Sequence, residues 1–116
     1  DEAISVENSK VLAAEVDAAN VDTLREMCDR FRQKLGSAAI ALGSVIDESP
    51  VVIVAVSEDL VSDGLQAGQL ANTAGQQIGG GGGGRPTMAQ AGGKDASQLN
   101  GALDEVRKRI LEQLEH

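Results

Sequence analysis

The sequence predicts an α/β (or α+β) domain: a small mixed sheet of about four strands with three helices, in the order β-α-β-β-α-β-α. Short β-rich runs alternate along the chain with segments whose apolar residues recur at helical spacing. A length of 116 residues is typical of one domain that buries its own core. Hydrophobic residues make up 41% of the chain, yet Phe31 is the only aromatic residue. We therefore expect an aliphatic core in which helices lie close to the sheet.

The first third of the chain predicts one strand and one helix. Residues 1–9 are largely polar and are expected to be frayed, and residues 10–16 form the first strand. Asn20 is a favourable N-cap, and Gly36 stands where a glycine commonly ends a helix. The apolar residues between them recur at spacings of three and four and predict one helix face: Val21, Leu24, Cys28, Phe31 and Leu35.

The middle of the chain predicts a hairpin. Residues 37–46 and 50–57 are β-rich, and the polar turn-like segment 47–50 joins them. Because residues 51–56 are apolar throughout, we expect a central strand that is buried on both faces. The acidic segment 57–63 is the connection that follows.

Two further helices flank a glycine-rich segment. Asp63 is expected to cap a helix over residues 64–78, whose many Gly and Ala residues indicate tight packing against a sheet or a partner. A short strand over residues 88–91 precedes a last helix that Asp95 caps. That helix has an apolar stripe formed by Leu99, Ala102, Leu103, Val106 and Ile110.

Catalytic and metal-binding constellations are absent from the sequence. Cys28 is the only cysteine and His116 the only histidine, which excludes an internal disulfide, a Cys-His cluster for zinc and a serine or cysteine nucleophile paired with a histidine of the domain itself. Cys28 occupies a core-facing helix position and reads as a small hydrophobic residue. Residues 114–116 read as an expression-tag remnant, so that residues 1–113 form the single domain. A reducing, cytoplasmic compartment and no membrane contact are expected.

The charge distribution restricts where a nucleic acid could bind. A net charge of −8 is the opposite of the usual basic footprint. Residues 64–103, however, contain only one acid, Asp95, against Arg85 and Lys94. RNA would therefore bind locally, with a shallow dependence on salt.

Six consecutive glycines, Gly79 to Gly84, are the most unusual feature of the chain. One interpretation is a flexible linker. The other is an ordered loop whose bare main chain lets another molecule approach closely or whose amides bind an anion. Because a helix pattern leads directly into the tract and a strand and a capped helix follow it, an ordered loop is favoured.

Three side chains near the glycines are candidates for contacts. Arg85 could bind a phosphate or stack on a base, or could pair with an acid of residues 47–63. Gln90 could read a base or ribose edge, or satisfy a backbone group. Lys94 could hold a phosphate near the start of the last helix, or be a solvated turn lysine. Met88 is expected in the core.

The segment GGGGGGRPTMAQAGG resembles the glycine-rich signature of the globular C-terminal domain of alanyl-tRNA synthetases, a member of the DHH-associated domain family. The resemblance implies a non-catalytic domain that contacts the outer corner of tRNA and supports aminoacylation and editing. By position, it places these residues at the RNA: Gly80, Gly81, Gly82, Gly83, Gly84, Arg85, Gln90, Gly92, Gly93 and Lys94.

The same resemblance implies the partners and cofactors. The partners would be tRNA(Ala) and other domains of one alanine–tRNA ligase chain, and not DNA. No cofactor is expected in this domain, whereas the longer chain would use ATP and zinc.

Two alternatives stay open. One is the substrate-binding or nucleic-acid-binding domain of a DHH phosphoesterase, although Arg85 stands where those relatives usually carry a histidine. The other is a dimerisation module that uses the Gly/Ala face of residues 64–78 in a homodimer.

Overall fold

The computed structural model describes residues 3–115, and within that range the chain forms one six-stranded sheet and four α-helices. The elements are β1 (Ile4–Val6), β2 (Ser9–Glu15), α1 (Val21–Leu35), β3 (Ala38–Ile46), β4 (Ser49–Val56), α2 (Glu58–Ser62), α3 (Ala67–Gln77), β5 (Gly81–Gly84), β6 (Met88–Gly92), the 3₁₀ helix η1 (Ala96–Gln98) and α4 (Leu99–Leu114). The strand order is β1-β2-β3-β4-β6-β5. Strands β2 and β3 are parallel and the other neighbours antiparallel, so the predicted mixed α/β class is confirmed.

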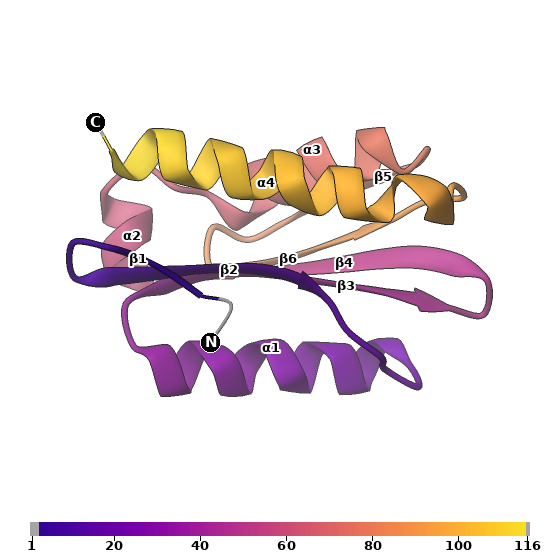
Figure 1. Ribbon diagram of the computed structural model, residues 1–116, viewed down its shortest axis with the longest axis horizontal. Helices are drawn as coiled ribbons and strands as arrows, with labels where there is room; N and C mark the ends of the chain where they lie inside the picture. The colour runs from indigo at the N-terminus through magenta and orange to yellow at the C-terminus, as the bar shows by residue number, and fades with distance from the viewer. Residues whose placement is uncertain (1–2, 116) are drawn as a thin grey trace.

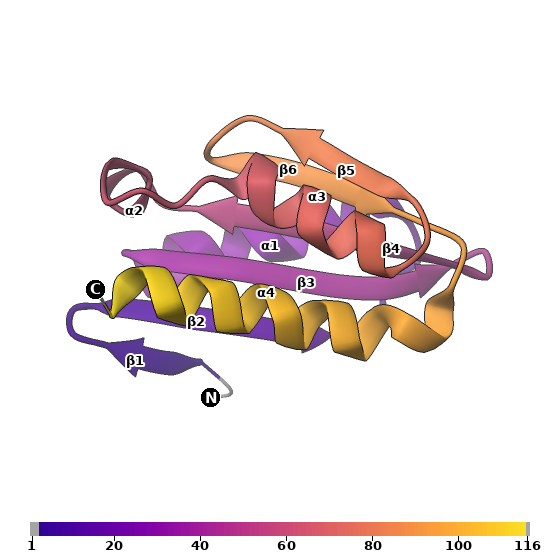
Figure 2. The same ribbon diagram turned by 90° about the horizontal axis from the view of Figure 1, so that it is seen from above.

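The sheet lies between helices on its two faces (Figure 1). Helix α1 covers β3 and β4 from one side, where Leu24 and Cys28 are fully buried. On the other side α4 lies over β2 and β3, while α3 packs across β4, β5 and β6 (Figure 2). Helix α1 packs mainly on β3 and β4, whereas β5, at the far edge of the sheet, has α3 on one face and exposed glycines on the other.

The central hairpin and the first helix form as their sequences predict. Residues 52–56 of β4 have no exposed surface, because α1 and α3 cover the two faces of this strand. Asn20 caps α1 through its side-chain oxygen, which accepts a hydrogen bond of 2.8 Å from the Thr23 N–H. Gly36 ends α1 with a φ of 77°, a left-handed value that favours glycine.

The predicted number of strands is too low, because β1 and β5 were not expected. Residues 3–9 are not simply frayed: β1 pairs with β2, with Ile4 opposite Val11. Residues 1 and 2 lie outside the described residues, as does His116 of the predicted tag remnant. Leu114 is the last residue of α4 and packs against the core.

The boundary of α3 also differs from the prediction. Asp63 ends the short helix α2, and α3 begins at Ala67. The chain changes direction between them at Gly64, whose φ is 110°. Across residues 3–115 no helix combines the length and apolar content needed to cross a bilayer.

Candidate nucleic-acid interface

Four of the six glycines form the edge strand β5, Gly81–Gly84, so the prediction of a loop is wrong for this part of the tract, and Gly79 and Gly80 lie in the turn before it. Strand β5 pairs only with β6, in an antiparallel hairpin in which Gly81 lies opposite Gly92 and Gly83 opposite Gln90. Glycine is depleted in strands, so no local feature of the sequence indicated this pairing. The tract nevertheless remains at the surface: Gly82 is half-buried, and the other five glycines are exposed.

One face of β5 needs glycine because α3 packs directly on it. A Cβ on Gly82 would lie 2.5 Å from the carbonyl oxygen of Ala71, and one on Gly68 of α3 would lie 2.8 Å from that of Gly84. A Cβ on Gly75 would overlap the main chain of Gly81. Real Cβ atoms do not approach other atoms this closely, so the glycines of α3 and of this face let the two backbones meet.

This packing also occupies the Gly/Ala face that could have formed a dimer. Ala67, Ala71, Ala74 and Gly75 are buried within the chain, against β5 and the core. The dimerisation alternative therefore loses the free surface on which it was based.

The opposite face of the hairpin carries glycines that packing does not require. A Cβ on Gly81, Gly83 or Gly92 would meet no atom within 4 Å, and none of the three has a left-handed φ. Partners in a strand pair project to the same side of the sheet, so these residues share one face with Gln90. We call the surface formed by Gly81, Gly83 and Gly92 the glycine shelf.

The glycine shelf lies on the α1 side of the sheet. Met88 lies on the same face of β6 as Gln90 and Gly92, two and four residues further along, and it packs partly buried against the α1 core, as predicted. Gln90 is half-buried, and its Oε1 accepts a 3.0 Å hydrogen bond from Nη1 of Arg25 on α1. The bare main chain is thus bordered by Met88, Gln90 and Arg25.

Arg85 and Lys94 lie at opposite ends of the hairpin. Arg85 follows β5 in the turn to β6, where its N–H donates to the Met88 carbonyl at 2.9 Å. Lys94 follows β6, and its N–H donates to the Ile78 carbonyl at 2.9 Å. Both side chains are exposed, and neither forms an ion pair with any of residues 3–115. The structure does not bring these two cations together.

Four of the ten predicted site residues are glycines with a packing role: Gly82, which faces α3, Gly84, where a Cβ would lie 2.7 Å from the Cα of Ala89, and also Gly80 and Gly93. A Cβ on Gly80 would overlap the carbonyl group of Gly92, and one on Gly93 would overlap Ile78. Packing within the fold is sufficient to explain why these positions are glycine. The residues that packing leaves unexplained are those of the glycine shelf.

The described residues contain no alternative chemical centre. Burial raises the pKa of Cys28 to about 12, which keeps it a thiol at neutral pH. Residues 3–115 contain no group of three or more His, Cys, Asp or Glu residues that could hold a metal ion.

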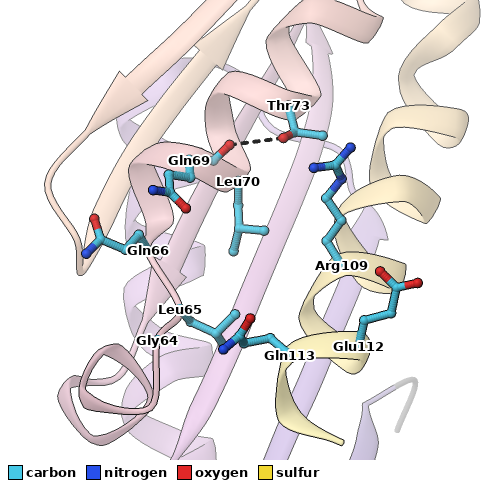
Figure 3. A pocket seen from close by; sticks show the side chains of 9 residues that line it. All are labelled: Gly64, Leu65, Gln66, Gln69, Leu70, Thr73, Arg109, Glu112 and Gln113. Carbon is cyan, nitrogen blue, oxygen red and sulfur yellow. Dashed lines mark hydrogen bonds between the residues drawn. The ribbon is translucent and has the colours of Figure 1, made fainter. Parts of the chain in front are cut away.

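A separate groove of about 320 Å³ lies between α3 and α4, on the other face of the sheet (Figure 3). Gln69 and Thr73 line one wall, and Arg109 and Gln113 line the other. Nε of Arg109 is already paired with Glu105 at 3.0 Å, and Gln113 donates to the Asp63 carbonyl at 3.3 Å. None of the predicted site residues lines this groove.

The structure defines the class of this domain as a mixed α/β domain with a glycine hairpin at the sheet edge. Comparison with known proteins identifies its family. The chain belongs to the DHHA1 domain family, whose profile matches residues 8–112. It is similar to alanine–tRNA ligases of Pelotomaculum thermopropionicum (47% identity over 94% of this chain) and Acaryochloris marina (44% over 98%). It spans only 12% and 13% of those relatives' lengths.

A solved structure shows the same fold. The C-Ala domain of Aquifex aeolicus alanyl-tRNA synthetase superposes with a TM-score of 0.76, at 24% identity, covering 93% of this chain and 96% of that one. The resemblance to alanyl-tRNA synthetase C-terminal domains that the glycine-rich segment indicated is confirmed by these matches.

The sequence did not distinguish Arg25 from the other basic residues of α1. Arg25, Arg30, Arg32 and Lys34 all stand in one helix segment, and nothing local marks the one that reaches β6. The contact between Arg25 and Gln90 joins residues 65 positions apart, so only the tertiary fold reveals it.

Proposed function

We propose that this chain is a non-catalytic, accessory tRNA-binding domain of an alanyl-tRNA synthetase, and that its glycine hairpin contacts the tRNA. The family membership and the alanine–tRNA ligase relatives support the assignment of the parent protein as an alanyl-tRNA synthetase. The main observation in support of this contact is the glycine shelf. Its three glycines share an open face, and packing within the chain does not require glycine at any of these positions.

Glycine at these positions has a cost that a purely structural role would not explain. In a strand interior it is destabilising by roughly 0.5–1 kcal/mol relative to alanine. Alanine at Gly81, Gly83 or Gly92 would meet no neighbour within 4 Å. A surface without side chains lets a flat ligand lie against the main chain, and proteins recognise RNA largely by shape and by stacking on exposed bases.

The charges agree with a small, local contact. The chain as a whole is acidic, with a net charge of −8, and repels a polyanion at long range. The exposed cations beside the hairpin are Arg85 and Lys94 at its ends and Arg25 at its side. On this proposal few phosphates are neutralised, and tRNA(Ala) binds with a shallow salt dependence.

The remaining parts of the proposal follow from the identity proposed for the parent protein. The partners are tRNA(Ala) and the other domains of the same cytoplasmic chain, which carries out aminoacylation and editing. ATP and zinc belong to parts of that longer protein, and the domain itself uses no cofactor.

A single valine on the glycine shelf tests the contact. Fluorescently labelled tRNA(Ala) is titrated with the wild-type chain, Gly81→Val and Ser5→Val at about 50 mM and about 200 mM salt. Ser5 is an exposed residue of the distant edge strand β1, so Ser5→Val adds the same side chain far from the hairpin. We expect Gly81→Val to weaken binding at least about tenfold, or ~1.4 kcal/mol, and Ser5→Val to leave it unchanged.

Circular dichroism establishes that Gly81→Val is folded, which the open space around Gly81 leads us to expect. Absence of wild-type binding at the lower salt, or equal binding by a folded Gly81→Val, contradicts the proposal.

A further inference from the structure

We infer that Arg25 of α1 contacts RNA at the glycine shelf and that Gln90 holds it in position. The inference rests on the proposed function and adds to it a side chain from a different element of the fold. Arg25 lies outside the glycine-rich segment, 54 positions before its first glycine in the printed numbering, Gly79.

Gln90 places the Arg25 guanidinium beside the middle of the shelf. Nη1 of Arg25 donates to Oε1 of Gln90 at 3.0 Å. Gln90 lies directly opposite Gly83, and both project toward the α1 side of the sheet. Neither side chain covers the shelf, because no atom lies within 4 Å of a Cβ position on Gly83. A flat group resting on Gly83 would therefore have Arg25 and Gln90 along one edge.

Within the described residues, 3–115, no carboxylate forms an ion pair with Arg25. Among residues 3–115, the arginine–carboxylate pairs are Arg32–Asp29, Arg107–Asp104 and Arg109–Glu105. Arg25 is exposed and belongs to none of them, although Asp22 and Glu26 stand close to it in the α1 sequence. Among residues 3–115, the only side chain that the Arg25 guanidinium hydrogen-bonds is the neutral Gln90 amide, so none of these residues pairs a carboxylate with it at the shelf.

The unused hydrogen-bond donors indicate what Arg25 would bind. A guanidinium has five N–H donors in a planar fork, and one of them is used by Gln90. The others suit the paired oxygens of a phosphate, a geometry that arginine recognises well. The ligand class is therefore an exposed nucleobase on the glycine shelf whose backbone phosphate meets Arg25. Arg85 and Lys94, at the hairpin ends, would reach neighbouring nucleotides.

The test compares charge-matched variants of α1 in the tRNA(Ala) titration. Arg25→Gln and Arg30→Gln each remove one exposed arginine from the same helix, and Arg25→Lys keeps the charge but removes the fork. We expect Arg25→Gln to weaken binding about 5- to 20-fold and to reduce the slope of log K against log salt by about one. Arg30→Gln is expected to match the wild type. Arg25→Lys is expected to keep the wild-type slope with an intermediate affinity.

The slope separates a direct phosphate contact from a structural role. If Arg25 only positioned Gln90, Arg25→Gln would weaken binding without changing the slope, and the inference would be overturned. It would also be overturned if Arg25→Gln and Arg30→Gln behaved alike. If the Arg25 variants gave either of these results while Gly81→Val abolished tRNA binding, the proposed function would stand and only the role of Arg25 would be rejected. If the wild-type chain bound no tRNA, both would fall.

Discussion

At the residue scale, neighbouring glycines of one tract have different roles. Gly82 faces α3, where the Ala71 carbonyl leaves no room for a side chain. Gly81 and Gly83 face the open side of the hairpin and are not restricted by any neighbour. The alternation follows from the two-residue period of a strand, which sends successive positions to opposite faces. A uniform polyglycine sequence thus combines a packing face with a candidate binding face.

This difference predicts opposite effects of two alanine substitutions on stability. Gly82→Ala is expected to lower the free energy of unfolding by about 1–3 kcal/mol, because the new Cβ overpacks α3 against β5. Gly81→Ala is expected to raise it by about 0.4–1 kcal/mol, because it restricts the unfolded chain at a site without steric conflict. Urea unfolding followed by circular dichroism measures both. The same change at both positions would show that the two faces of β5 are equivalent.

At the element scale, residue patterns predicted the elements that are stabilised by their own side chains. Helix α1 has an N-cap at Asn20, a terminal Gly36 and an apolar stripe, and all three appear in the structure. Strand β5 could not be predicted, because consecutive glycines do not favour a strand and show no alternation of apolar and polar residues. Its pairing depends on β6 and α3, which come together only in the folded chain. The site was predictable to the same extent: the segment was found, but its two faces and the contribution of α1 were not.

A second element-scale feature connects α2 to the central hairpin through Asp59. Its carboxylate accepts hydrogen bonds from the hydroxyls of Ser37 at 2.5 Å and Ser57 at 2.6 Å. These bonds, that of Ser37 foremost, hold the pKa of Asp59 below its usual value of 3.8. A lowered folded-state pKa contributes stability that is present above the unfolded-state value and is lost as the pH falls through the folded-state value.

Asp59→Asn therefore predicts a pH-dependent loss of stability. The variant should be less stable than the wild type at neutral pH, and the difference should shrink as the pH falls below 3.8. Asp63→Asn makes the same charge change within the same connection and serves as the charge-matched control. Urea midpoints measured between neutral and acidic pH provide the comparison. A difference that stayed constant over this range would exclude the hydrogen-bonded carboxylate as its cause.

At the scale of the whole molecule, the layers leave one part of the sheet accessible. Helices α3 and α4 cover strands β2 to β6 on one face, whereas α1 packs mainly on β3 and β4 on the other (Figure 2). The exposed part is the glycine shelf, on the α1 side of β5 and at the end of β6. The acidic residues lie mainly elsewhere in the chain, since residues 64–103 contain one acid, Asp95. Architecture and charge therefore direct a polyanion to the same place.

The central claim is that RNA rests on the open face of the glycine hairpin, and backbone amide chemical shifts measured during addition of tRNA(Ala) test it most directly. Gly81, Gly83, Gln90 and Gly92 should show the largest changes, followed by Arg25, because these residues surround the proposed contact. Residues of the α3–α4 groove, such as Gln69 and Gln113, should stay unchanged. Changes concentrated in that groove, with an undisturbed glycine shelf, would contradict the account.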